Sequence, residues 1–165
     1  MSATAPPPAT LTVCSALVVR RAPTPDGSRE FLLVRTREMK RDTYRLPVGQ
    51  PTNTGCRDHF DLHDAVRCGT GLRIVVGRLL VTDRVTTATG GRVHHHVLLC
   101  SPHGTDQKIR LGSGLCGYRW ASEDDIDTVC VPALAPTLTA AVRACGLARS
   151  FELANGRPVG ACAGV

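Results

Sequence analysis

Apolar and polar positions alternate in two ways along this chain, and the two patterns predict strands and helices. Apolar, β-branched runs bounded by turn residues predict strands over 12–20, 31–35, 72–85 and 93–100, with short extended pieces at 44–46 and 118–121. Apolar residues spaced three and four apart predict helices over 57–68 and 134–146, and a single helical turn at 124–129. Because strands and helices do not alternate regularly, we expect an α/β fold with a mixed β-sheet between helices.

The two ends of the chain lack these patterns. Residues 1–11 are rich in proline, alanine and threonine and are expected to form a flexible N-terminal tail. Residues 148–165 are rich in glycine and alanine and read as a C-terminal tail. The remainder, 12–147, is long enough to bury one hydrophobic core, so we expect a single domain.

The charge and composition of the chain limit the classes of partner that it is expected to bind. The formal net charge is +6, which suits an anionic small molecule. Nucleic acid is not expected as a partner, because the arginines are scattered and aromatic residues make up only 4% of the chain. No apolar run approaches the roughly 18 residues of a membrane helix, and Arg20 and Arg21 follow the longest run instead of preceding it as in a signal peptide. A cytoplasmic protein without a membrane partner is therefore expected, and a homodimer is left open.

The eight cysteines of the chain form no Cys-x-x-Cys pair, so a structural zinc site is not expected. In a cytosolic chain the ordinary state of a cysteine is the free thiol. Cys14, Cys100 and Cys130 stand among apolar residues and are interpreted as small core side chains.

Three segments resemble the Nudix superfamily. They are Arg45–Gly49 (RLPVG), Ala65–Leu72 (AVRCGTGL) and Tyr118–Ile126 (YRWASEDDI), in the order of predicted elements that this family shows. The resemblance spans about residues 12–146. It implies a Nudix-like α/β/α sandwich and hydrolysis of a nucleoside diphosphate linked to another group, with Mg²⁺ or Mn²⁺ held by glutamates on one helix face.

The chain departs from the family pattern at the metal-binding positions. Cys56, Ala65, Cys68 and Gly69 stand where the resemblance places glutamates, and Asp64 replaces an arginine. The chain's glutamates are Glu30, Glu38, Glu123 and Glu152, all outside this segment. Mg²⁺ or Mn²⁺ binding at the usual positions is therefore not expected, and no other cofactor is indicated.

Two histidines are the alternative candidates for catalysis. Strand alternation places His94 and His96 on one face with Cys100, and leaves His95 on the other. Together with Asp61 or Asp64 they are a candidate metal-independent acid/base set. The alternative for the histidines is that they cover a half-polar sheet surface. Asp58, Asp61 and Asp64 could form a relocated metal site, but we favour the simpler interpretation that they offset the helix dipole. A pair at His59 and His63 has metal-ligand spacing, but a solvated helix face explains it more simply.

The substrate is expected in a cleft between the 57–68 helix, the 48–56 loop and the 93–100 strand. Arg35, Arg45, Gly49 and Cys68 are the expected substrate-binding residues. The predicted function is an enzyme of nucleotide-linked or secondary small-molecule metabolism with a non-standard site. The alternative is a non-catalytic nucleotide- or metabolite-binding module, and a residual pyrophosphohydrolase is the third interpretation.

Overall fold

The computed structural model describes residues 10–51 and 59–160, and for residues 59 and 60 the backbone only. The expectations for Cys56 and Asp58, and for the side chain of His59, therefore lie outside the described residues. Within the described ranges no helix is both long and apolar enough to cross a membrane.

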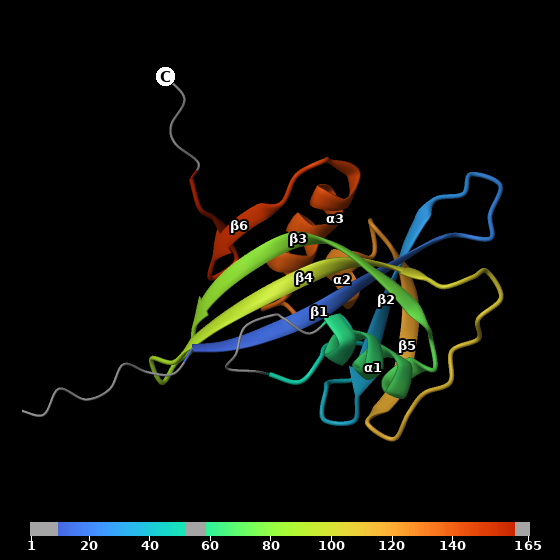
Figure 1. Cartoon of the computed structure of the whole chain (residues 1–165), viewed down its shortest axis with the longest axis horizontal. Helices are drawn as coiled ribbons and strands as arrows, with labels where there is room; N and C mark the ends of the chain where they lie inside the picture. The colour runs from blue at the N-terminus through green and yellow to red at the C-terminus, as the bar shows by residue number, and fades with distance from the viewer. Residues whose placement is uncertain (1–9, 52–58, 161–165) are drawn as a thin grey trace, which may run out of the picture.

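Seven strands form one mixed sheet in the order β5-β2-β1-β4-β3-β6-β7 (Figure 1). The β1–β4 and β3–β6 pairs are parallel and the other pairs are antiparallel. The strands are β1 Thr10–Arg21, β2 Arg29–Thr36, β3 Ile74–Thr86, β4 Arg92–Pro102, β5 Leu115–Ser122, β6 Phe151–Ala154 and β7 Arg157–Pro158. This confirms the mixed sheet that the sequence predicts.

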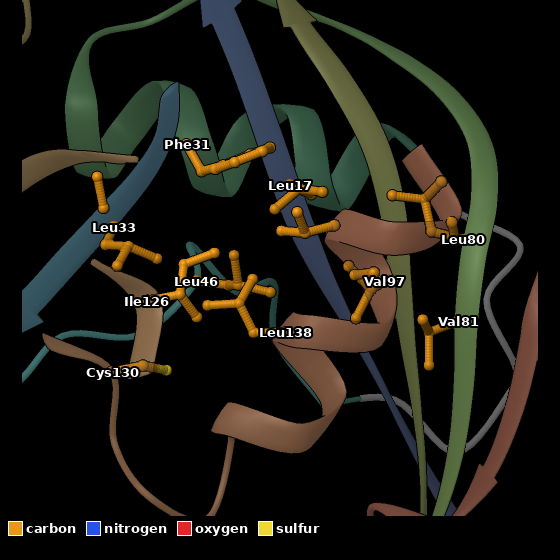
Figure 2. Packing of buried hydrophobic residues seen from close by; sticks show 14 of the residues in the cluster. Leu17, Phe31, Leu33, Leu46, Leu80, Val81, Val97, Ile126, Cys130 and Leu138 are labelled. Atoms are coloured by element: carbon orange, nitrogen blue, oxygen red, sulfur yellow. The ribbon is translucent and has the colours of Figure 1, made fainter. Parts of the chain in front are cut away.

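The helices cover both faces of the sheet and divide the core in two (Figure 1). Helix α1 (His59–Thr70) packs Leu62 and Val66 against one face. Helices α2 (Ile126–Val129) and α3 (Ala135–Gly146) pack against the other face. Figure 2 shows that second core, with Leu138 of α3 among side chains from the strands. The α/β/α sandwich is therefore confirmed.

β1 and β2 diverge, and this divergence creates room for a further segment between them. The two strands pair only from Val19 to Arg21. Beyond that, residues 44–49 lie between them: the amide of Ala16 donates to the carbonyl oxygen of Pro47 at 2.9 Å, and that of Gly49 donates to Cys14 at 2.9 Å. The Leu-Pro-x-Gly segment is thus held in the opening of the sheet.

The expected C-terminal tail is wrong in part, because residues 151–158 add two strands to the sheet. β6 pairs with β3 along Val81–Arg84. The buried carboxylate of Asp83 accepts hydrogen bonds from the hydroxyl of Thr137 at 2.8 Å and from the amide of Gly156 at 3.1 Å. These tertiary bonds hold a segment whose own composition does not favour a strand.

The cysteines follow the sequence interpretation at two of three positions. Cys100 and Cys130 are buried, and burial raises the pKa of their thiols to about 12 and about 11. Cys14 differs from the expectation, because it is disulfide-bonded and only half-buried. Sequence spacing did not reveal this bond, because it depends on which cysteines the fold brings within reach.

Candidate functional site

A cavity of about 320 Å³ opens between the C-terminal half of α1, the end of β2, the inserted 45–50 segment and the loop before β5. We call it the α1 cavity. Its described lining residues are Val34, Thr36, Arg45, Pro47, Val48, Gln50, Ala65, Cys68, Gly69, Thr70, Gly112, Ser113, Gly114 and Leu115.

Arg45 is the one cation among these described lining residues. Its backbone exchanges two hydrogen bonds with Val34, at 2.8 and 2.9 Å, which fixes the residue beside the diverging strands. The Nε atom of Arg45 is buried and has no hydrogen-bond partner in the described part of the chain. A buried donor without a partner costs about 1–3 kcal/mol, so this wall of the cavity is suited to an acceptor from a ligand.

The end of α1 forms the opposite wall. Gly71, at φ +74°, follows the last helical residue, and its amide donates to the carbonyl oxygen of Arg67 at 2.8 Å. This is the left-handed cap that commonly ends a helix. The amide of Arg110 then donates to Thr70 at 2.8 Å, and that of Gly112 to Gly69 at 2.9 Å, so the loop before β5 is tied directly to the helix end.

The structure brings together two of the four expected substrate-binding residues. Arg45 and Cys68 both line the α1 cavity. Gly49 is buried, and a Cβ placed on it would contact the backbones of Cys14 and Leu62. Arg35 lies on the other face of β2 from Val34 and Thr36, with its guanidinium 5.8 Å from the ring centre of Tyr44.

Four polar lining residues were not expected as site residues from the sequence, namely Thr36, Gln50, Thr70 and Ser113. Gln50 and Ser113 stand in turn-rich segments, where sequence alone reads a loop and no site. Only the folded chain shows that these two loops face each other across the end of α1.

The α1 cavity does not fit the divalent metal that the Nudix resemblance implies. The residues that α1 contributes to it are Ala65, Cys68, Gly69 and Thr70, and none of the described lining residues is an aspartate or glutamate. Mg²⁺ and Mn²⁺ require hard oxygen ligands, chiefly carboxylates. No cluster of three potential ligands occurs among the residues that the structure describes.

Three of the chain's four glutamates pair with arginines outside the α1 cavity. Glu30 pairs with Arg20 at 2.8 Å, Glu152 with Arg84 at 3.2 Å, and Glu123 lies 3.5 Å from Arg29. None of these three belongs to the α1 cavity. The fourth, Glu38, lies in the turn after β2, where hydrogen bonds from its own backbone and from Thr36, and then the charge of Arg45, lower its pKa. We therefore derive no step through a metal ion here.

His94 and His96 lie on the α1 face of β4, as strand alternation predicted. Leu98 and Cys100 continue this face into the α1 core, while Val97 joins the α3 core. The two rings are 6.5 Å apart in an edge-to-face arrangement. The Oγ1 of Thr82 lies 3.0 Å from Nδ1 of His96, and burial, with a smaller effect from His94, lowers the pKa of His96.

The aspartates of the predicted acid/base set lie on the exposed side of α1. Asp61 and Asp64 are both exposed, and Asp64 lies 3.7 Å from Nδ1 of His63. In the described part of the structure no hydrogen bond or ion pair joins either aspartate to His94 or His96. Neither histidine lines the α1 cavity.

No protein-family model matches this sequence, and no curated protein matches it either. Solved structures do match its fold. An ADP-ribose pyrophosphatase from Streptococcus suis is 16% identical, with a TM-score of 0.62 over 87% of this chain and 98% of that one. An Ap4A hydrolase binary complex from C. elegans is 13% identical, with a TM-score of 0.60 over 82% and 95% of the two chains.

A NUDIX hydrolase from Nitrosomonas europaea is 16% identical, with a TM-score of 0.61 over 90% of this chain and 92% of that one. These identities are low, so the likeness shows the fold alone. The order of strands, the two-sided helical cover and the position of α1 beside the Leu-Pro-x-Gly segment agree with it. This chain has the Nudix fold.

Proposed function

We propose that the α1 cavity binds a small anionic molecule of the nucleoside-diphosphate class, without metal-dependent hydrolysis of it. The main support for this proposal is the set of polar groups in the wall of the cavity. Among the described lining residues are one arginine, the amide of Gln50 and three hydroxyl side chains, but no carboxylate. The hydroxyl groups are those of Thr36, Thr70 and Ser113. Such a wall attracts a phosphate and offers no oxygen ligands for a divalent cation.

The charge of the whole chain and the names of its structural neighbours support the same class of ligand. A formal charge of +6 favours association with an anion. The printed names of the structural neighbours, an ADP-ribose pyrophosphatase and an Ap4A hydrolase, concern nucleotide-linked molecules. A non-catalytic nucleotide- or metabolite-binding module is the role that the cavity supports best.

Calorimetric titration with ADP-ribose in EDTA tests this proposal. We expect binding to wild-type protein, and an affinity about 10- to 100-fold lower for Arg45→Met, because a charged hydrogen bond contributes about 1.5–3 kcal/mol. Arg41→Met is the matched control, since Arg41 is exposed and outside the cavity lining. Equal weakening by both variants, or no binding at all, would contradict the proposal.

A metal-independent enzyme at His94 and His96, with Asp61 or Asp64 as the acid partner, is the second candidate. The lowered pKa of His96 favours it, because a neutral imidazole is available as a base near neutral pH. His94→Ala and His96→Ala should then abolish turnover of the substrate with thermal stability nearly unchanged. Full activity in both variants would reject this candidate and leave the binding module.

A further inference from the structure

A second cavity, of about 480 Å³, shares none of its described lining residues with the α1 cavity. We call it the Trp120 cavity. Its described lining residues are Arg20, Arg21, Pro23, Leu72, Pro102, Gly104, Thr105, Gln107 and Trp120. Leu72 belongs to the α1 core and Trp120 packs against that core. The Trp120 cavity therefore lies on the α1 face of the sheet, beyond the C-terminal end of the helix.

The guanidinium of Arg20 lies over the ring of Trp120. Both side chains are on the α1 face, because Ala16 and Val18 of β1 pack in the α1 core and Arg20 continues their alternation. The Cζ atom of Arg20 is 4.1 Å from the centre of the Trp120 ring, and its Nε donates to Glu30 at 2.8 Å. Because two contacts already hold the guanidinium in one position, a ligand that binds it has little side-chain freedom left to remove.

Donors of this guanidinium are left for a ligand. In the described part of the chain, no hydrogen bond or ion pair uses the Nη atoms of Arg20, and its side chain is 37% exposed. Arg21 brings a second positive charge to the wall, with its Nη1 3.3 Å from the carbonyl oxygen of Gly27. Glu30 offsets one of the two charges, and none of the described lining residues is an acid. The surroundings thus favour a single negative charge.

The rest of the wall is apolar and is held in place without a ligand. Its apolar side chains, besides Trp120, are Pro23, Leu72 and Pro102. Gln107 fixes the loop at the rim: its Oε1 accepts from the amide of Arg73 at 2.6 Å, and its Nε2 donates to the carbonyl oxygens of Arg73 and His103, both at 2.8 Å. Because these bonds order the loop, a ligand finds the cavity already formed.

We propose that the Trp120 cavity binds a small aromatic carboxylate. Its carboxylate accepts hydrogen bonds from the Nη atoms of Arg20, the geometry that guanidinium and carboxylate groups favour. Its ring packs against the flat side chains of Trp120 and Pro102, where a planar ring makes more contact than a puckered one. Binding here is independent of the α1 cavity, because the two share no described lining residue.

The first test is an NMR titration of wild-type protein with benzoate. Trp120 is the only tryptophan of the chain, so its indole N–H gives one signal that reports on the cavity. We expect this signal and the amide of Thr105 to shift and to saturate. Benzamide has the same ring without the charge, and cyclohexanecarboxylate has the charge without the aromatic ring. Both should bind at least fivefold more weakly. An indole signal that does not respond, or equal binding of either analogue, would overturn the proposal.

Substitution of Arg20 tests the role of its guanidinium. Arg20→Met should weaken benzoate at least tenfold, because it removes a charged hydrogen-bond donor. Arg84→Met is the matched control, since Arg84 also pairs with a glutamate of the sheet, Glu152 at 3.2 Å, but lies outside the cavity lining. Benzoate affinity that is unchanged in Arg20→Met, or equally reduced in Arg84→Met, would overturn the proposal.

A second variant reports on charge even if Arg20→Met does not fold. Glu30→Gln removes the carboxylate beside the bound anion, while its amide oxygen can still accept from Nε of Arg20, so benzoate should bind about twofold more tightly or better. Glu152→Gln should leave the affinity unchanged. Weaker binding in Glu30→Gln would contradict an anion at Arg20. Failure of ADP-ribose to bind wild-type protein would overturn only the proposed function, because benzoate is measured at a separate cavity.

Discussion

The amide of Gly112 donates a hydrogen bond to the carbonyl oxygen of Gly69 at 2.9 Å, and this bond closes the α1 cavity. The approach is so close that a Cβ on Gly112 would come within 3.0 Å of the carbonyl oxygen of Cys68. A side chain at this position must therefore push the loop away from the end of α1. The shape of the α1 cavity therefore depends on the absence of a side chain at position 112.

Gly112→Ala should consequently weaken ADP-ribose binding at least fivefold, because the loop that carries Ser113 must shift. Gly114→Ala is the matched control: Gly114 also lines the cavity, but a Cβ there meets nothing within 4 Å. Calorimetry on both variants checks the difference. Equal affinities would show that the position of this loop does not matter for binding.

The Ser15–His95 pair predicts an asymmetry in stability among neighbouring histidines. His95→Ala leaves the buried hydroxyl of Ser15 without its partner, so we expect a loss of about 1–3 kcal/mol in the free energy of unfolding. His94→Ala removes no described hydrogen bond and should cost about 0.5 kcal/mol or less. Urea denaturation measures both. A larger loss from His94→Ala would contradict the assignment of the two faces.

The lowered pKa values of His95 and His96 predict acid sensitivity. Both lie below the ordinary value of 6.5 in the folded chain, so the unfolded chain binds more protons in this range. The stability that the two neutral imidazoles contribute to the folded chain is fully present above about pH 6.5. It is lost as the pH falls toward their pKa values in the folded chain. The double variant with His95→Gln and His96→Gln should show a smaller loss of unfolding free energy between pH 7 and pH 5. If the free energy of unfolding of the double variant falls with pH as steeply as that of wild type, the two histidines are not the cause of the acid sensitivity.

Among the acidic residues of the sheet, we expect substitution of Asp83 to lower the free energy of unfolding the most. Asp83→Ala removes the acceptor for Thr137 and Gly156 and should cost about 2–4 kcal/mol, because buried, hydrogen-bonded charges are expensive to disrupt. The exposed Asp124→Ala is the control and should cost about 0.5 kcal/mol or less. Hydrogen exchange should also show faster exchange at Leu153 of β6. A variant as stable as Asp124→Ala would show that Asp83 does not hold the C-terminal strands.

The sequence predicted the elements whose side chains carry a clear period. The β-branched runs of β1 and β4, the apolar face of α1 at Leu62 and Val66, and the opposite faces of His94 and His95 all follow from local spacing. Near Gly77, β3 shifts register against β4, and a Cβ on this glycine would approach the carbonyl oxygen of Leu99 at 3.0 Å.

Features that depend on distant contacts were not predictable in the same way. β6 is four residues long and is held by pairing with β3, and the tail composition around it conceals this strand. The position of Arg45 beside the α1 cavity results from the divergence of β1 and β2, which no local pattern encodes. The Ser15–His95 bond joins residues 80 positions apart.

The central claim is that the α1 cavity binds a diphosphate without metal-dependent hydrolysis, and a ³¹P NMR time course of ADP-ribose with the protein and Mg²⁺ tests it most directly. The account predicts that the diphosphate signals shift or broaden on addition of protein, while no monophosphate signals appear. Monophosphate signals growing at a turnover above about 1 s⁻¹, an ordinary enzyme rate, would contradict the account. Diphosphate signals that do not respond to the protein would contradict it equally.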